Sequence, residues 1–424
     1  MYRKPILNRR TPIQRFTVLL AAVLLTVLSA ACGGQMPRRN LLPLPPTPTR
    51  IGTSASSPPV MVQASATPQR AVPPPTLTAT PVVIEIVAPP PSGKLYHGVF
   101  PGSHDGAEDD LTLEDLRSYE QAAGKPAAWV YFSHNWDPDR RFPLQTATWI
   151  RSAGSIPYIR LMLRTRYVRN EADPFFTLER INQGDLDKDL RAWARQAAKF
   201  GTPLMAEFGT EVNLRQFTWN GTWNGGGETT GFGDPSQPDG PEQFQAAYRR
   251  IIQISREEEA TNVLWVFHAN QRDVPGQEWN RLEQYYPGDD WIDWIGVSVY
   301  GAQSPLDTEW EEFRPMMDAA YARLVALSPT KPIVVLEFGV TNGNPLGNQA
   351  DWAAAALADL MGGRWPRVIG FAWWNEAWDR DDDPAHPTTM RLQDNPALAA
   401  VFQQLVGQNA AALGETLQIP AALR

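Results

Sequence analysis

The stretch "PLMAEFGTEVN", residues 203–213, is the first evidence for the fold. Its apolar residues are typical of a β-strand, yet it carries two carboxylates, Glu207 and Glu211, directly before a loop rich in Gly, Trp and Asn. Burying an unpaired carboxylate is costly, so a strand that carries acids usually has a use for them. Side chains four positions apart on a strand share a face. Both acids are therefore predicted to point inward, with Glu211 at the end of the strand and Glu207 one layer deeper.

Seven further stretches have the same strand-like character, and helix-like segments with charged faces lie between most of them. Eight strands that alternate with helices over roughly 300 residues predict an α/β fold of the (β/α)8 TIM-barrel type. A doubly wound open sheet is the alternative, but no Gly-rich phosphate loop follows the first strand. The predicted strands are residues 94–100, 127–133, 156–163, 203–211, 262–270, 292–300, 332–340 and 368–376, and the clearest predicted helices are residues 185–200, 241–259, 313–327 and 349–363.

The first 31 residues have the layout of a secretory signal peptide. Five basic residues and no acid precede an apolar run and the small residues "SAACGG". Cys32 directly follows Ser29-Ala30-Ala31, which resembles a bacterial lipobox, and a lipid on Cys32 would anchor the mature protein outside the cytoplasmic membrane. The alternative is an ordinary signal peptide with an incidental cysteine. Either possibility predicts an extracytoplasmic protein, lipid-anchored or secreted.

Residues 32–92 are dominated by Pro, Thr, Ser and Ala and have no apolar period. Such a segment cannot bury enough surface to fold, and its prolines keep it extended. It is predicted to be a disordered tether that holds the barrel, residues 93–410, away from the membrane. Residues 411–424 are predicted to be a C-terminal tail.

Composition excludes several classes of partner and cofactor. The chain has 38 basic and 46 acidic residues, a net charge of −8, which argues against a nucleic-acid partner. The single cysteine excludes an internal disulfide, and the five histidines form no zinc-binding pattern, so no metal or other cofactor is expected. The acidic stretch 379–386 is read as a solvated loop, with calcium binding as the alternative. The 16 tryptophans suit either sugar stacking or core packing.

If the fold is a (β/α)8 barrel, the acids of the fourth predicted strand, residues 203–211, lie near an active site, because active sites of such barrels lie at the C-terminal ends of the strands. Glu211 and Glu337, near the end of the seventh strand, are predicted to face each other across the mouth. Two carboxylates, one protonated and one ionised, suit cleavage of a glycosidic bond, and a separation of about 5–5.5 Å gives retention. Tyr300 is placed to hydrogen-bond the nucleophile. Arg160 on the third strand is expected to neutralise Glu207, which is more plausible as an ion-pair partner than as a catalyst.

Aromatic residues recur at the same strand ends. Trp219, Trp373 and Trp374 could stack on sugar faces, and the alternative is that they belong to the core while Glu337 merely caps a helix. His268, near the end of the fifth strand, is a candidate sugar contact or a plain hydrogen-bonding residue. The Gly-rich stretch 219–242 is expected to shape one side of the cleft, since loops of this length are usually functional or disordered.

These residues carry a resemblance to the glycoside hydrolase family 26 β-mannanases of clan A. Family members have a strand-four motif H-E-M-N-G followed by aromatics, and this chain has Thr210-Glu211-Val212-Asn213 followed by Phe217 and Trp219. The likeness continues in residues 240–270, 285–301 and 331–340 and covers most of 94–380. It implies Glu211 as acid/base and Glu337 as nucleophile. It also implies that Asn213, Tyr300 and the two tryptophans at 373 and 374 contact substrate.

The sequence therefore predicts a retaining glycoside hydrolase that cleaves β-linked polysaccharide or oligosaccharide, mannan or a related β-glycan. Thr210 stands where the family has His, Leu214 where it has Gly, and Gln216 replaces the first following aromatic, so a preference for mannan does not follow from the resemblance. The alternative function is a non-hydrolytic cell-surface lipoprotein that binds polysaccharide with a degenerate barrel.

Overall fold

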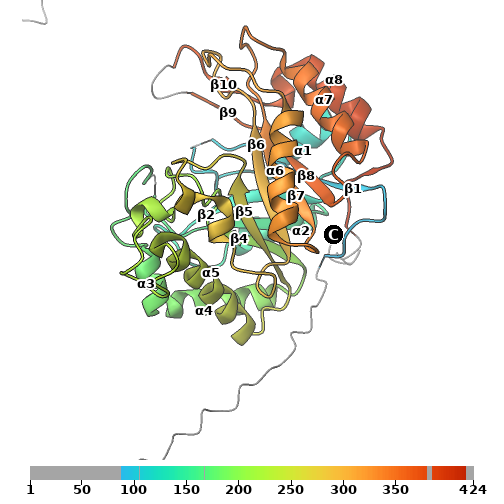
Figure 1. The fold of residues 1–424 in the computed structure, drawn as a ribbon. Helices are drawn as coiled ribbons and strands as arrows, with labels where there is room; N and C mark the ends of the chain where they lie inside the picture. Colours follow the sequence, from blue (N-terminus) through green and yellow to red (C-terminus); the bar gives the residue numbers. More distant parts are fainter. Residues whose placement is uncertain (1–86, 105, 167, 380–383, 417–424) are drawn as a thin grey trace, which may run out of the picture. The chain divides into compact units, whose positions relative to one another are not determined.

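The computed structural model describes residues 87–104, 106–166, 168–379 and 384–416. Within them, eight parallel strands follow one another around a closed barrel in which β1 pairs with both β2 and β8 (Figure 1). This confirms the predicted (β/α)8 barrel. The barrel strands are β1 (Leu95–Phe100), β2 (Trp129–Asn135), β3 (Ile156–Met162), β4 (Leu204–Phe208), β5 (Val263–Asn270), β6 (Trp294–Tyr300), β7 (Ile333–Gly339) and β8 (Val368–Trp374).

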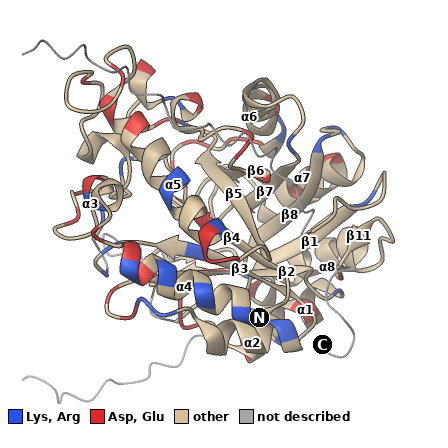
Figure 2. Ribbon diagram, turned by 90° about the horizontal axis from the view of Figure 1, so that it is seen from below, with Lys and Arg blue, Asp and Glu red and all other residues tan. Residues whose placement is uncertain are grey.

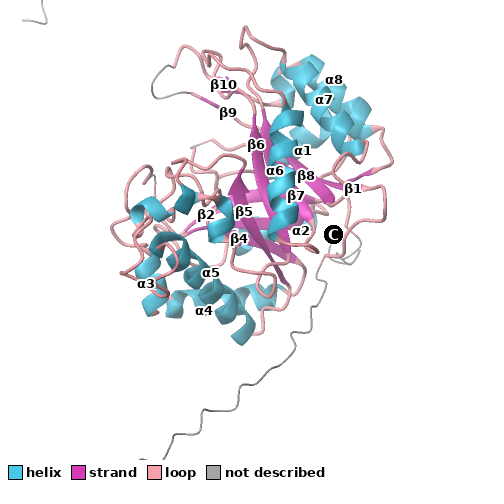
Figure 3. Cartoon of the chain, viewed as in Figure 1, coloured by secondary structure: helices cyan, strands magenta, loops and turns pink. Residues whose placement is uncertain are grey.

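Helices connect the strands and surround the barrel (Figure 3). They are α1 (Leu113–Ala123), α2 (Leu144–Ser152), α3 (Leu178–Gln183), α4 (Asp187–Phe200), α5 (Asp239–Glu257), α6 (Phe313–Leu327), α7 (Gln349–Met361) and α8 (Pro396–Phe402). The four helices predicted from the sequence correspond to α4, α5, α6 and α7. The helix α1 was not among the clearest signals, although Thr112 and Asp115 form a capping box at its start. No helix in the described residues is long and apolar enough to span a membrane.

The outer faces of α4 and α5 carry the charge that their sequences suggest (Figure 2). Arg191 on α4 lies 2.6 Å from Glu257 on α5, and Arg250 on α5 lies 2.7 Å from Asp187 on α4. These pairs are partly exposed and contribute little individually. The two helices pack against the barrel through their apolar faces, so the charged residues are left on the solvent side.

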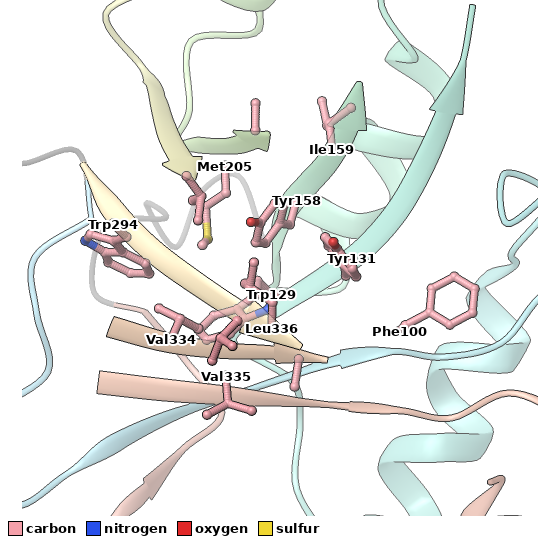
Figure 4. Packing of buried hydrophobic residues seen from close by; sticks show 14 of the residues in the cluster. Phe100, Trp129, Tyr131, Tyr158, Ile159, Met205, Trp294, Val334, Val335 and Leu336 are labelled. Carbon is pink, nitrogen blue, oxygen red and sulfur yellow. The ribbon is translucent and has the colours of Figure 1, made fainter. Parts of the chain in front are cut away.

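Apolar and aromatic side chains fill the barrel interior toward the N-terminal ends of the strands (Figure 4). Buried polar side chains follow toward the mouth. Trp129 fills the lower part: a Cβ at Gly98 or Gly370 would lie within 2.2 or 2.6 Å of its ring, so the ring packs directly on the backbone of β1 and β8. Above it, Tyr131 and Tyr158 meet edge to face with ring centroids 4.6 Å apart. Both hydroxyls point onward to a carboxylate, so the polar layer of the site begins here.

The backbone turns sharply between the two acids of the opening stretch. β4 ends at Phe208, Gly209 has φ 82°, and Glu211 itself is left-handed with φ 46°. A Cβ at Gly209 would lie 2.2 Å from the ring of Phe244, so both the turn and the close packing require glycine there. The prediction that Glu211 closes the strand was therefore wrong by three residues. Glu211 follows the strand and reaches the mouth from a turn.

The ordered contacts extend beyond residues 93–410 at both ends. Val87 is buried, and the Tyr96 hydroxyl donates to Ala88 O. At the other end, β11 (Ala412–Leu413) pairs in parallel with β1. Lys125 Nζ donates to Ala412 O at 2.8 Å, which fastens this segment to the barrel. The signal peptide, Cys32 and most of the tether lie outside the described residues, so those predictions stay predictions.

Candidate active site

The two glutamates predicted to form a pair line one pocket at the mouth of the barrel. Glu337 lies near the C-terminal end of β7, and Glu211 lies in the turn after β4. Their exposed fractions are 3% and 6%. The pocket has a volume of about 110 Å³ and is also lined by Tyr300 and Trp374, the last residues of β6 and β8. The structure thus brings four of the predicted site residues together.

Glu337 has one hydrogen bond and one longer ion-pair contact within the described residues. The Tyr300 hydroxyl donates to its Oε2 at 2.9 Å, and Arg160 Nη2 lies 3.8 Å from its Oε1. Within the described chain, Oε1 accepts no hydrogen bond although it is buried. Burial raises the pKa of Glu337 to about 7; Arg160 opposes this rise in pKa, and the negative charge of Glu211 adds to it. A buried carboxylate that lines a pocket and has one oxygen without a hydrogen bond from the described residues is suited to attack a bound molecule.

Glu211 is held by two amides. Asn270, the last residue of β5, donates from Nδ2 to Glu211 Oε1 at 2.7 Å, and Gln216 Nε2 lies 3.4 Å from Oε2. Asn213 lies outside this contact set: it is fully buried, and its Oδ1 accepts the backbone N–H of Asn270 at 2.8 Å. Asn213 thus organises the loop that presents Asn270. Sequence reasoning did not single out Asn270, although a polar residue at a strand end next to the acid was the available signal.

Glu207 lies below the pocket in a closed set of donors. The hydroxyls of Tyr131 and Tyr158 donate to it at 2.7 and 2.8 Å, the Thr210 hydroxyl also donates to it, and His268 Nδ1 lies 3.0 Å from Oε1. Burial alone would raise the pKa of Glu207, but His268 and Arg160 hold it below its ordinary value. The same contact raises the pKa of His268 against the effect of burial. The two residues therefore form a buried ion pair.

The predicted partnership of Arg160 with Glu207 is confirmed at 3.8 Å, with His268 as the closer partner. Arg160 pairs most closely with Glu108, which follows β1. Its guanidinium is also 5.4 Å from the ring centre of Trp374. One buried cation thus lies within 3.8 Å of both Glu207 and Glu337. His268 itself donates or accepts at Ser298 Oγ (2.7 Å) and lies beneath the pocket, where only a hydrogen-bonding role is open to it.

The three predicted tryptophans have different locations. Trp374 lines the pocket and stacks on Phe100 with centroids 4.0 Å apart. Neighbouring residues on a strand face opposite sides, so Trp373 points away from the barrel axis and packs among helix residues, fully buried, with its N–H donated to Met390 O. Trp219 is buried behind Phe217, which lines the pocket and stacks on it at 5.0 Å. Of the three, only Trp374 is brought to the carboxylates.

Loops supply the pocket residues that the sequence did not reveal. They follow β1, β3 and β6, and they are Glu108, Arg164, Arg169 and Gln303, with Trp378 from the short strand β9 (Ala377–Trp378). None of the described residues of 219–242 lines this pocket; that loop packs on Trp279, so the expectation that it shapes the cleft is not met here. Positions 380–383 of the acidic stretch lie outside the described residues. Across the described ranges, no group of three or more side chains is arranged to hold a metal ion.

Glu207→Ala is expected to lower the free energy of unfolding by about 3–5 kcal/mol, because it leaves the buried Arg160 and His268 charges uncompensated. Chemical denaturation at pH 7 would measure the change. Glu114→Ala, which removes an exposed acid from α1, is the control and should stay close to wild type. A fully stable Glu207→Ala variant would contradict the buried-pair reading.

Comparison with known proteins shows that the sequence around the two carboxylates is similar to that of glycoside hydrolases. Residues 212–340 match the model of Glycosyl hydrolase family 26, a range that begins one residue after Glu211 and contains Glu337. The chain is 26% identical over 294 residues to Endoglucanase H of Acetivibrio thermocellus, covering 69% of this chain and 29% of that protein. It is 24% identical over 160 residues to Beta-1,3-xylanase TXYA of a Vibrio species, covering 38% of this chain and 28% of that protein.

A solved structure supports the fold independently. A GH26 beta-mannanase from Bacteroides ovatus superposes with a TM-score of 0.53 at 15% identity, covering 77% of this chain and 92% of that one. This chain therefore shares its barrel architecture with that structure. It spans less than a third of the length of both curated relatives.

Proposed function

We propose that this protein is a retaining glycoside hydrolase that cleaves β-linked polysaccharide, with Glu337 as nucleophile and Glu211 as acid/base. The observation that carries the proposal is the pocket itself: two buried carboxylates share it, one from the turn after β4 and one from β7, and each is held by different donors. The match of residues 212–340 to the family model supports the same reaction class. Two acids in unequal surroundings are the requirement for cleavage by general acid and nucleophile together.

In the first step, a Glu337 oxygen attacks the anomeric carbon while Glu211 gives its proton to the departing glycosidic oxygen. The bond to the leaving sugar breaks, and an ester between Glu337 and the remaining sugar forms. The Tyr300 hydrogen bond keeps the other Glu337 oxygen fixed, and Arg160 stabilises the ionised form before attack. Trp374 supplies an apolar wall next to the ring.

In the second step, Glu211 is ionised and takes a proton from water, whose oxygen attacks the same carbon from the opposite side. The ester breaks, the configuration is retained, and Glu337 returns as a carboxylate. Asn270 donates to Glu211 Oε1 and so fixes the orientation of this carboxyl group in both steps. The carboxyl oxygens are expected to lie about 5–5.5 Å apart, as retention requires.

The acid limb of the pH profile is expected near pH 7, because Glu337 must be ionised to attack and burial raises its pKa to about 7. Tyr300→Phe removes a hydrogen bond to the ionised form, so it should raise the pKa of Glu337 further. The limb of kcat/KM should move upward by about one pH unit, the equivalent of one hydrogen bond to a charged group. Tyr321→Phe, on α6, is the control and should leave the limb in place. A downward shift for Tyr300→Phe would contradict the assignment.

The polysaccharide is best identified by a panel of β-mannan, mixed-linkage β-glucan, β-1,3-xylan and bacterial exopolysaccharides, assayed for new reducing ends. The relatives are named as an endoglucanase, a xylanase and a mannanase, so the panel covers all three polymers. Release of reducing ends from at least one polymer, with none from the Glu337→Gln variant, is the expected result. Binding without cleavage across the panel would favour the non-hydrolytic surface protein instead.

We also propose that Cys32 is lipidated and holds the enzyme on the outer side of the cytoplasmic membrane. The basic head, the apolar run and the small residues before Cys32 support this. Cys32→Ser is expected to move the protein from the membrane fraction to the medium, as followed by cell fractionation. Wild-type protein found entirely in the medium would exclude the anchor.

A further inference from the structure

Arg164 is a buried cation that forms no ion pair with a carboxylate of the described residues. It is 1% exposed, it lines the pocket that holds Glu211 and Glu337, and its one hydrogen bond among the described residues is from Nε to Asn135 Oδ1 at 3.3 Å. The neighbouring Arg160 has three acids within ion-pair distance. Burial lowers the pKa of Arg164 to about 10; the charges of Arg169 and Arg160 add to this fall, and those of Glu108 and Asp109 oppose it.

Arg169 adds a second cation on the same side. It lies in the loop after β3, lines the same pocket and is exposed, and it forms no ion pair with any carboxylate in the described part of the chain. Arg169 and Arg164 carry the same positive charge, so the two guanidinium groups repel each other as long as no anion lies between them. An anion bound near both would relieve this repulsion.

The charged residues that line the pocket lack the acidic excess of the whole protein. The chain carries a net charge of −8. The charged residues that line the pocket are three arginines and three glutamates, Arg160, Arg164, Arg169, Glu108, Glu211 and Glu337. One of the two catalytic glutamates must be protonated for the first step, so three positive charges face two negative ones. The Arg160–Glu108 pair is internally compensated, which leaves Arg164 and Arg169 with an excess of positive charge.

We propose that the sugar bound beside Glu211 and Glu337 is acidic, a β-linked uronic acid whose carboxylate is bound by Arg164 and Arg169. This inference rests on the proposed function. Guanidinium groups bind carboxylates through paired, charge-assisted hydrogen bonds. A neutral sugar would offer only hydroxyl groups to a buried cation, and the desolvation of Arg164 would stay uncompensated. The two arginines therefore determine specificity for the glycan.

The test uses two oligosaccharides with the same linkages, one containing β-linked glucuronic acid and the other its carboxyl-reduced, neutral counterpart. The full-length enzyme is expected to have a kcat/KM at least about tenfold higher for the acidic one, since a single charge-assisted contact is worth about that factor. Arg169→Gln and Arg164→Gln should remove most of this preference, because each should lower kcat/KM more for the acidic oligosaccharide than for the neutral one. Arg117→Gln, an exposed position on α1, is the control and should keep the preference.

Several outcomes would overturn the inference. These are equal or better cleavage of the neutral oligosaccharide, an equal fall on both substrates in Arg169→Gln, or a stronger preference for a sulfated neutral chain. Thermal unfolding of Arg164→Gln shows whether a loss of activity in this variant comes from a loss of fold. If it does, Arg169→Gln still tests the inference, because Arg169 is exposed and its replacement should not unfold the protein.

A failure of the proposed function would give a different result from a failure of the acidic-sugar inference. If neither oligosaccharide and no polymer of the panel is cleaved, the proposed hydrolysis is wrong, and calorimetric binding then tests the charge inference alone. Tighter binding of the acidic chain by wild type than by Arg169→Gln supports the acidic-sugar site. Equal binding of the acidic and neutral chains overturns it.

Discussion

Glu337→Gln is expected to lower kcat/KM on the cleaved polysaccharide by about 10⁴-fold or more, the scale seen when a covalent nucleophile is removed. Glutamine has the same shape and can still meet Tyr300, but its amide cannot form the ester with the anomeric carbon. The neighbouring carboxyl group of Glu211 cannot substitute, because it is needed as the proton donor. Initial rates at pH 7, measured with purified variant and wild type, give the ratio.

The matched control is Glu376→Gln. Glu376 is also buried near the barrel mouth, burial raises its pKa to about 7, and it accepts a hydrogen bond from Ser103 at 2.9 Å, yet it does not line the pocket. Its variant should retain most activity. A 2-fluoro glycoside, which forms the ester but hydrolyses slowly, should add one sugar mass to the peptide that contains Glu337. Labelling of Glu211 instead would exchange the two roles.

Glu211→Gln is expected to lose about 10²- to 10⁴-fold on polysaccharide, the contribution of a positioned general acid. The loss should be much smaller for the first step with an aryl glycoside whose phenol is already a good leaving group, because that departure needs no proton. Pre-steady-state release of the phenol measures this step directly. Breakdown of the ester should also be slow, since no base remains to activate water.

An equal loss on both kinds of substrate would contradict the acid/base role of Glu211. Gln216→Ala is a useful comparison, because it removes only the long 3.4 Å contact to Glu211 and leaves the Asn270 hydrogen bond in place. It should reduce activity far less than loss of the carboxylate does. A collapse of activity in Gln216→Ala would indicate that the position of Glu211, rather than its proton, limits the reaction.

The sequence was sufficient for the barrel because buried parallel strands are short apolar runs separated by amphipathic helices. It also predicted that Tyr300, Glu337 and Trp374 lie at or near the ends of β6, β7 and β8, as the structure shows. It failed where the backbone leaves regular geometry. No pattern of apolar residues predicts the left-handed turn that presents Glu211, and Gly209 was the one residue in the sequence that indicated a turn there.

Alternation along a strand also limited the prediction. Trp373 and Trp374 are equivalent in composition, and only the direction of the pleat decides that one faces the pocket while the other packs against helices. Glu108, Arg164 and Arg169 come from loops, where no pattern relates a residue to its position in space. The three arginines of the pocket could therefore not be predicted from a chain whose net charge is −8.

The pairing of β11 with β1 determines where the barrel can be joined to a label, a solid support or a second domain. Leu95 and Ala412 are register partners at the first residue of β1, and Gly414 abuts Pro126, just before β2. Both ends of the described domain thus emerge at the floor of the barrel, opposite the openings of Glu211 and Glu337. A fluorophore, a solid support or a second binding module joined at either end leaves the mouth of the barrel clear. Under the proposed function, protein immobilised through either end should therefore still cleave long chains that approach from solution.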